Sequence, residues 1–204
     1  SVLVYASSAA TYGSLPSPQT VGKESPENPY GYSKYIMDQA AIKFSVENPD
    51  LTIVGLRFFN VYGPREYYKA NTSSMIIQLG HQILSGNSPR LFENSSEISR
   101  DFIYIDDVIQ ANIKACSPKL NGTYNIGTGT SRSFQEVSNI LQNELKTELT
   151  TEYFPNPHNG YQKHTQANIS TSKKYLGFNP NFSLEQGIQA YISEIKRLHG
   201  TKNL

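Results

Sequence analysis

Short apolar runs alternate along this chain with longer amphipathic segments, and this alternation predicts an α/β protein with a parallel sheet. Residues 2–7 and 51–59 are apolar enough for strands that are buried on both faces. Residues 30–46 lie between them and carry apolar side chains, among them Ile36 and Phe44, in a helical stripe. The same patterns predict strands over 89–92, 100–105, 122–127 and 151–154, and helices over 73–84, 106–115, 133–145, 170–175 and 184–198.

The predicted elements indicate where loops lie and which residues cap the helices. The segments 7–13 and 60–65 each follow a buried strand, so they are expected at the carboxyl edge of the sheet, where ligands bind in parallel sheets. Ser133 with Glu136 matches a capping box at the start of a helix. Asp106 or Asp107 is expected to cap the helix that ends near residue 115.

The composition excludes several classes of function. The net charge of +1 and the 17% of charged residues leave no basic run dense enough for a nucleic-acid or membrane surface. No apolar stretch approaches the roughly 20 residues of a membrane span. Cys116 is the single cysteine, so an internal disulfide is impossible and a reducing compartment, the cytoplasm, is expected. His158 and His164 lack a third ligand at useful spacing, so no metal is expected.

A tyrosine and a lysine four residues apart are the first candidates for chemistry. Tyr30 and Lys34 would share one helix face and reach one reacting centre. A free tyrosine has a pKa of about 10, and a nearby ammonium lowers that pKa. Ser8, in the serine-rich run upstream, could hold the hydroxyl or carbonyl whose proton moves. This arrangement suits hydride transfer between a nicotinamide and an alcohol, although the tyrosine–lysine pair alone also occurs on ordinary surface helices.

Five motifs occur in a fixed order over the first 130 or so residues. They are YASSAATYG (5–13), PYGYSK (29–34), LRFFNVYGPR (56–65), RDFIYIDDV (100–108) and YNIGTG (124–129). In these motifs the chain resembles the extended short-chain dehydrogenase/reductase family of nucleotide-sugar epimerases and dehydratases. The resemblance implies the C-terminal part of an NAD(P)-binding Rossmann fold joined to a smaller α/β substrate-binding lobe.

The resemblance also implies a division of the chain. Residues 1–64 would be the remaining half of the Rossmann domain, with a returning strand near 123–127, and residues 65–204 would be mainly the substrate-binding domain. The family's GxxGxxG phosphate loop does not occur in this sequence, and the chain opens directly on an apolar strand. We therefore expect a C-terminal piece of a longer protein, with an open sheet edge at 2–5.

Within the family, the chain is most similar to the members that act on an ADP-linked heptose. Four details carry this similarity: SSAATYG in the serine loop, Glu66 and Lys69 after Pro64-Arg65, Leu91-Phe92-Glu93 before the RDF motif, and Tyr161-Gln162 with Thr165-Gln166-Ala167 in a late loop. The implied reaction inverts C6 of ADP-D-glycero-D-manno-heptose through a transient C6 ketone with bound NADP, or with NAD. Such an enzyme would supply heptose for the lipopolysaccharide core.

Two other interpretations stay open. One is a UDP-sugar 4-epimerase or a dTDP-sugar 4,6-dehydratase of the same family. The other is a non-catalytic fragment that binds a nucleotide sugar. By resemblance, the partners are a small-molecule ADP-heptose and further copies of the chain, as a homo-oligomer and specifically a pentamer.

The resemblance assigns roles to particular residues. Tyr30 and Lys69 would be the two acid/base groups, Lys34 would bind the nicotinamide ribose and tune Tyr30, and Ser8 would bond the reacting oxygen. The cofactor would contact Tyr30, Lys34, Lys69 and the backbone of Val61. The substrate would contact Ser8, Asn60, Asn71, Gln78, Phe92, Glu93, Asn94, Ser95, Arg100 and Tyr161. Ala70-Asn71-Thr72 departs from the Gly-Ser-type segment expected after Lys69.

Overall fold

The fold is known from a computed structural model, which describes residues 1–117, 121–156 and 162–202, without the side chains of Asn71 and of residues 201–202. Its strands are β1 (Val2–Ser8), β2 (Thr52–Phe58), β3 (Asn60–Tyr62), β4 (Arg90–Phe92), β5 (Ser99–Arg100), β6 (Phe102–Tyr104), β7 (Gly122–Ile126), β8 (Arg132–Ser133) and β9 (Glu152–Phe154). The α-helices are α1 (Pro29–Glu47), α2 (Met75–Leu84), α3 (Ile105–Ala115), α4 (Phe134–Leu145) and α5 (Leu184–Lys202). Three short helical segments are η1 (Ala9–Tyr12), η2 (Glu66–Thr72) and η3 (Ser172–Leu176). The predicted α/β class is confirmed.

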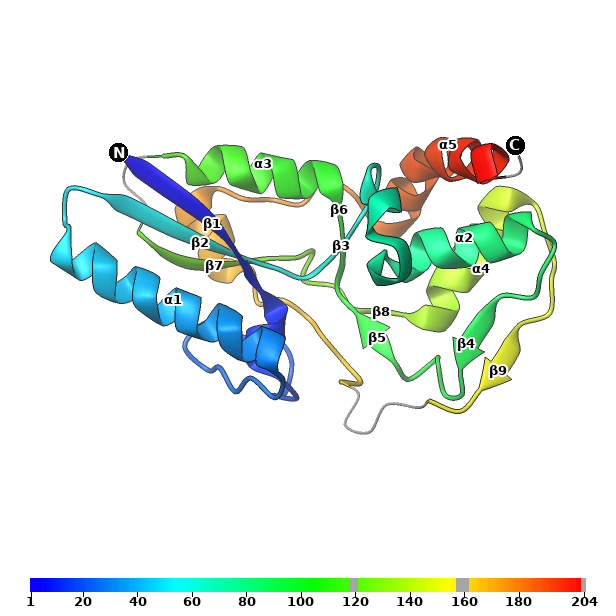
Figure 1. The fold of residues 1–204 in the computed structure, drawn as a ribbon, viewed down its shortest axis with the longest axis horizontal. Coiled ribbons are helices and arrows are strands. Elements are labelled where there is room, and N and C mark those ends of the chain that lie inside the picture. Colours follow the sequence, from blue (N-terminus) through cyan, green and yellow to red (C-terminus); the bar gives the residue numbers. More distant parts are fainter. Residues whose placement is uncertain (118–120, 157–161, 203–204) are drawn as a thin grey trace.

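A three-stranded parallel sheet, in the order β1-β2-β7, forms one end of the molecule. Helices α1 and α3 lie on opposite faces of this sheet (Figure 1). Strand β2 lies between the other two and is buried almost throughout, as its apolar sequence predicts. Strand β1 has no further described strand on its outer side, and Leu3 is largely exposed there.

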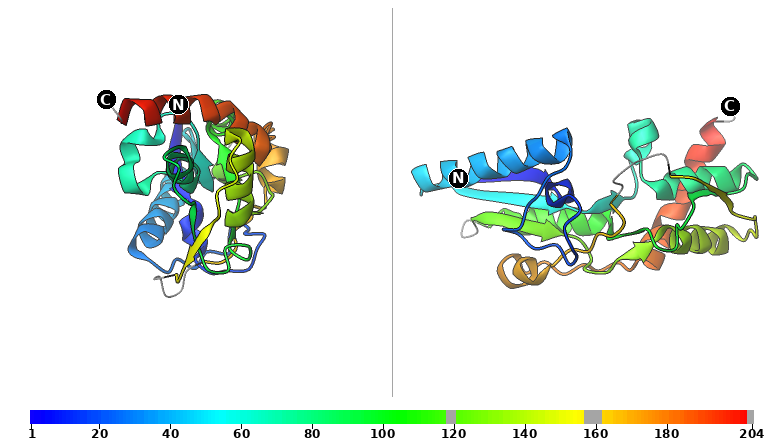
Figure 2. Two further views of the ribbon diagram at one scale, coloured as in Figure 1. Left: turned by 90° about the vertical axis from the view of Figure 1, so that its right-hand side faces the viewer. Right: turned by 90° about the horizontal axis from the view of Figure 1, so that it is seen from below.

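The other end of the molecule is built mainly from helices. Helices α2, α4 and α5 pack together around the largest apolar cluster, in which Ile76, Leu141 and Ile188 are fully buried. Small strand pairs border this cluster: β3 with β6 and β4 with β9 are parallel, and β5 with β8 is antiparallel. Figure 2 shows the resulting elongated shape, with the sheet at one end and these helices at the other.

One buried residue in the loop after η1, Gln19, bonds to a segment far along the chain. The backbone N–H of Gln19 donates to the carbonyl of Gln166 at 2.8 Å, and the N–H of Asn168 donates to the carbonyl of Gln19 at 2.9 Å. The side-chain oxygen of Gln19 accepts from the N–H of Gln166. Because Gln19 is buried, these bonds fasten the loop to the chain that runs between the two ends of the molecule.

The most informative departure from the sequence prediction concerns α1. Its limits agree with the prediction, but the predicted apolar stripe is not the buried face, since Ile36 is 46% and Phe44 48% exposed. The helix instead buries Gly31 against η1 and the carboxylate of Asp38 against the sheet. The reason is a buried arginine on β2, Arg57, which needs an anionic partner on the facing helix.

The two capping predictions had different outcomes. The capping box of Ser133 and Glu136 is present at the start of α4 and is confirmed. Neither Asp106 nor Asp107 is the N-cap of α3, which is Tyr104. The carboxylate of Asp107 accepts instead from the backbone N–H groups of Asn181 and Phe182, because that loop packs over the first turn of α3 with unpaired donors.

Replacing Ser133 by Ala should lower the free energy of unfolding by about 1 kcal/mol, because the backbone N–H of Glu136 loses its acceptor. Urea unfolding at neutral pH measures this difference. Ser133→Thr, which keeps the hydroxyl acceptor, is the control and should lose much less. Equal stability of Ser133→Ala and the unchanged protein would contradict the assigned cap.

Candidate functional site

A cleft of about 930 Å³ lies where the two ends of the molecule meet. The carboxyl ends of β1 and β2 border it on one side, and η2, α2 and β4 border it on the other. The residues that line it and were predicted from the sequence are Ser8, Tyr30, Lys34, Asn60, Val61, Lys69, Gln78, Phe92 and Arg100. The cleft therefore brings together residues as far apart in the sequence as Ala6 and Phe154.

Tyr30 and Lys34 begin helix α1 and face the cleft from the sheet side. Pro29 is the first residue of the helix, and the side chain of Asn28 caps it by accepting from the N–H of Gly31 at 2.8 Å. The ammonium of Lys34 lies 5.9 Å from the centre of the Tyr30 ring. It also donates to the carbonyl of Ala6 on β1 at 2.9 Å, which holds its charge beside the tyrosine.

Ser8 ends strand β1 and is both a capping residue and a cleft residue. Its hydroxyl oxygen accepts from the N–H of Ala10 at 3.1 Å and so caps η1. A hydroxyl has one proton to donate besides its acceptor sites. The Ser8 hydroxyl can therefore donate to an oxygen in the cleft while the cap stays intact.

Arginine and aromatic side chains gather at the opposite end of the cleft. The guanidinium of Arg100 is buried, lies 5.5 Å from the centre of the Phe134 ring and donates to the carbonyl of Ser99. The neighbouring carboxylate of Asp101 is turned away and accepts from Thr128, Gly129 and Ala167. Arg100 thus presents a cationic fork to the cleft, a geometry that suits a phosphate or diphosphate.

Lys69 reaches the cleft from η2, a short segment anchored by a buried glutamate. The carboxylate of Glu66 accepts from the backbone N–H and the hydroxyl of Ser74, each at 2.7 Å, which closes the segment onto the start of α2. Ala70, next to Lys69, has φ 47° and ψ −121°, a conformation that essentially only glycine adopts without strain. The segment that holds the lysine is therefore tethered at its base and strained beside the lysine itself.

Three residues predicted for the site lie outside the lining of the cleft. Glu93, Asn94 and Ser95 form the turn after β4 and are not among the residues that line the cleft; Ser95 is buried. The side chain of Asn71 and the whole of Tyr161 lie outside the described residues.

Arg90, Phe134 and Phe154 are among the residues that line the cleft but were not predicted from the sequence. The rings of Phe92 and Phe154 meet at 5.0 Å because β4 and β9 pair in parallel, and the guanidinium of Arg90 lies 5.0 Å from the centre of the Phe154 ring. The sequence shows an aromatic residue, Phe154, at the end of the predicted strand 151–154. It does not show which strand pairs with this one, and so it could not place Phe154 in the cleft.

The residues present fit the nicotinamide end of a dinucleotide better than a metal. Lys34 has three ammonium protons and the carbonyl of Ala6 accepts one, which leaves donors for the hydroxyls of a ribose. The site also lies at the carboxyl edge of a parallel sheet, where dinucleotides bind. Within the described residues, no group of three His, Cys, Asp or Glu side chains could hold a metal ion, and no helix could cross a membrane.

Comparison with known proteins gives the class. The chain belongs to the NAD-dependent epimerase/dehydratase family, whose sequence model matches residues 1–127. This confirms the resemblance inferred from the five ordered motifs.

Solved structures of epimerases are similar to this chain. ADP-L-glycero-D-manno-heptose-6-epimerase from Helicobacter pylori is 44% identical, with a TM-score of 0.86 over 96% of this chain and 59% of that one. UDP-N-acetylglucosamine 4-epimerase from Methanobrevibacter ruminantium is 29% identical, with a TM-score of 0.88 over 97% of this chain and 63% of that one. UDP-glucose 4-epimerase from Thermotoga maritima is 26% identical, with a TM-score of 0.89 over 97% of this chain and 64% of that one. The chain thus spans less than two thirds of each of these relatives.

Ala70→Gly should raise the melting temperature and stabilise the protein by about 1 kcal/mol. Relief of the strained backbone should stabilise the folded protein by about 1–3 kcal/mol. The greater freedom of glycine in the unfolded chain should offset roughly 0.5–1 kcal/mol of this. Ala40→Gly, an exposed position inside α1, is the matched control and should be destabilised by about 1 kcal/mol. Calorimetry compares the three proteins, and a loss at position 70 equal to that at position 40 would contradict the strained conformation.

Proposed function

We propose that this chain is the substrate-binding and acid/base part of an epimerase that inverts C6 of ADP-D-glycero-D-manno-heptose, with NADP as its cofactor. The observation that carries the proposal is that Tyr30, Lys34, Lys69 and Arg100 line a single cleft. The 44% identity to an ADP-heptose epimerase, against 29% and 26% to two UDP-sugar 4-epimerases, supports the choice of substrate.

Inversion at C6 needs either an intermediate that reorients in the site or acid/base groups on two sides of C6. NADP, held by Lys34, Tyr30, Lys69 and the Val61 backbone, would supply reversible hydride transfer at C6. Tyr30, with the ammonium of Lys34 beside its ring, would take the proton from the C6 hydroxyl while Ser8 donates a hydrogen bond to the same oxygen. Lys69 comes from η2 rather than from α1, so it can serve as the second acid/base group.

The far end of the cleft supports a nucleotide diphosphate. The guanidinium of Arg100 would bind the diphosphate, and Phe92 would lie against the nucleotide sugar. Asn60 and Gln78 would bind the sugar, and the Val61 backbone would bind the cofactor. We assign Asn71, Glu93, Asn94, Ser95 and Tyr161 to the same substrate by resemblance alone.

The division into a partial Rossmann domain over 1–64 and a mainly substrate-binding domain over 65–204 belongs to the same proposal. So do a cytoplasmic homo-oligomer, specifically a pentamer, and a role in supplying heptose for the lipopolysaccharide core.

The function is tested on the protein as it is naturally encoded, with any sequence that flanks these 204 residues. Proton NMR follows inversion at C6 of ADP-heptose, and release of cofactor on denaturation shows whether NADP or NAD is retained. UDP- and dTDP-hexoses are assayed in parallel. Turnover of a UDP- or dTDP-hexose in place of ADP-heptose would indicate a 4-epimerase or a 4,6-dehydratase. Binding without turnover of any sugar would indicate a binding protein.

Tyr30→Phe should reduce kcat for C6 inversion by about 10²–10⁴-fold, because ring packing is kept and the acid/base hydroxyl is lost. Binding of ADP-heptose, measured by calorimetry, should change little. Tyr32→Phe, two residues along the same helix and equally exposed, is the matched control and should retain full activity. A Tyr30→Phe enzyme with an unchanged rate would remove Tyr30 from the mechanism.

Lys69→Ala should also reduce kcat by about 10²–10⁴-fold, with little effect on stability because the side chain is exposed. Stability is measured by thermal unfolding alongside the rate. Lys23→Ala, another exposed loop lysine, is the control. A Lys69→Ala protein with a lowered melting temperature and an unchanged rate would show a structural role instead.

A further inference from the structure

Arg57 and Asp38 form a buried ion pair beneath the proposed site. Arg57 is 2% and Asp38 0% exposed, and the Nε and Nη2 atoms of Arg57 donate to Oδ2 of Asp38 at 2.9 and 2.8 Å. Burial alone would lower the pKa of Arg57, but Tyr12, Glu24 and Asp38 raise it above its ordinary value. Arg57 therefore stays charged in the interior.

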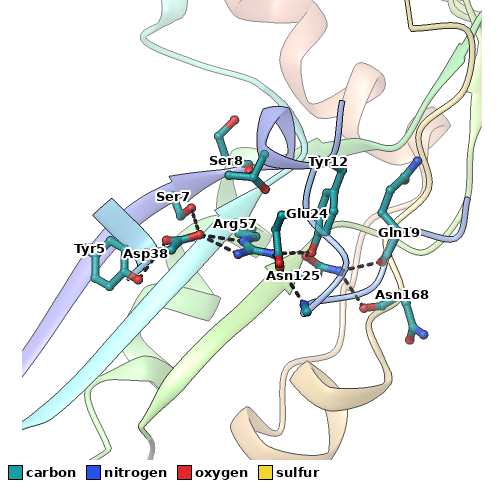
Figure 3. Close-up of polar contacts among 12 residues, drawn as sticks. Tyr5, Ser7, Ser8, Tyr12, Gln19, Glu24, Asp38, Arg57, Asn125 and Asn168 are labelled. Carbon is teal, nitrogen blue, oxygen red and sulfur yellow. Dashed lines mark hydrogen bonds and ion pairs between the residues drawn. The ribbon is translucent and has the colours of Figure 1, made fainter. Parts of the chain in front are cut away.

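The same carboxylate also joins helix α1 to strand β1. The hydroxyl of Tyr5 donates to Oδ1 of Asp38 at 3.0 Å, and the hydroxyl of Ser7 donates to Oδ2 at 2.9 Å. In Figure 3 these side chains converge on Asp38 from β1 and β2, while Ser8 points away from them. One residue of α1 thus receives hydrogen bonds from two neighbouring strands.

The spacing along α1 links this carboxylate to the proposed catalytic pair. Tyr30, Lys34 and Asp38 are separated by four residues each, so they follow one another along one helix face. Asp38 contacts Tyr5 and Ser7, and Lys34 donates to the carbonyl of Ala6 between them. The contacts of two successive helical turns therefore fix where α1 lies along β1.

We infer that Asp38 is a positioning residue, which sets Tyr30 and Lys34 against Ser8 by fixing α1 on β1. This inference rests on the proposed function. A buried ion pair contributes little net stability, because desolvation offsets the attraction between the charges. Its directional bonds can nevertheless fix one arrangement of the helix, and a misplacement of about 1 Å can cost 10²-fold in rate.

A split between kcat and KM separates positioning from a role in substrate binding. Misplacement of Tyr30 and Lys34 would slow the chemical step, which lowers kcat. The substrate contacts from the other elements that line the cleft, such as Arg100, would stay in place, so KM would change little.

The experiment uses three variants in the naturally encoded protein: Ser7→Ala, Tyr5→Phe and Asp38→Asn. The first two each remove one bond to Asp38 and leave the Arg57–Asp38 pair intact, so they remain informative if Asp38→Asn fails to fold. Ser45→Ala, which removes a hydroxyl bond to the carbonyl of Ile42 near the end of α1, is the matched control. Each is assayed for kcat and KM with ADP-heptose, and thermal unfolding shows that each variant is folded.

Ser7→Ala and Tyr5→Phe should each lower kcat about 10-fold, with KM within about twofold. A folded Asp38→Asn should show a larger loss of kcat, and Ser45→Ala should match the unchanged protein. Unchanged kcat in both Ser7→Ala and Tyr5→Phe, or a rise in KM as large as the loss of kcat, would overturn the inference. Full activity in Tyr30→Phe would overturn the proposed function itself, so the two failures are distinguishable.

Discussion

A guanidinium buried near the carboxyl end of β2 constrains much of the structure around it. Arg57 is the charged residue of a strand that is otherwise mostly apolar. A buried charge without partners would be very unfavourable, so Arg57 needs partners in the interior. Asp38 on α1, Glu24 on the loop and Tyr12 on η1 supply those partners. Satisfying one arginine therefore fixes a helix, a loop and a short helical turn against the same strand.

The arrangement of charge in the cleft follows from which segments meet there. Lys34 is held at the carboxyl edge of the sheet by a backbone carbonyl, Arg100 by its packing on Phe134, and Lys69 by a segment anchored through Glu66. Cations that come from three separate elements favour an anionic ligand that extends along the cleft. A nucleotide sugar has this form, with its diphosphate between a base and a sugar.

Much of the fold was determined by the sequence, because it depends on local patterns. The apolar run of β2, the proline and Asn28 at the start of α1, and the capping box of α4 each specify an element through contacts within a few residues. The ordered motifs likewise indicated the family, and with it Tyr30 and Lys34 as candidates. These conclusions needed no knowledge of which segments pair in space.

Tertiary structure alone decided which face of α1 is buried and which residues share the cleft. Apolar spacing suggested a buried stripe through Ile36 and Phe44, but a partner 19 residues away, Arg57, determined that Asp38 is buried instead. Phe154 could not be placed in the cleft because its position depends on pairing between β4 and β9. The sequence by itself determined the elements, the family and the reactive pair, and the long-range pairing of charges and strands decided how they are placed, because such pairing leaves no periodic trace in the chain.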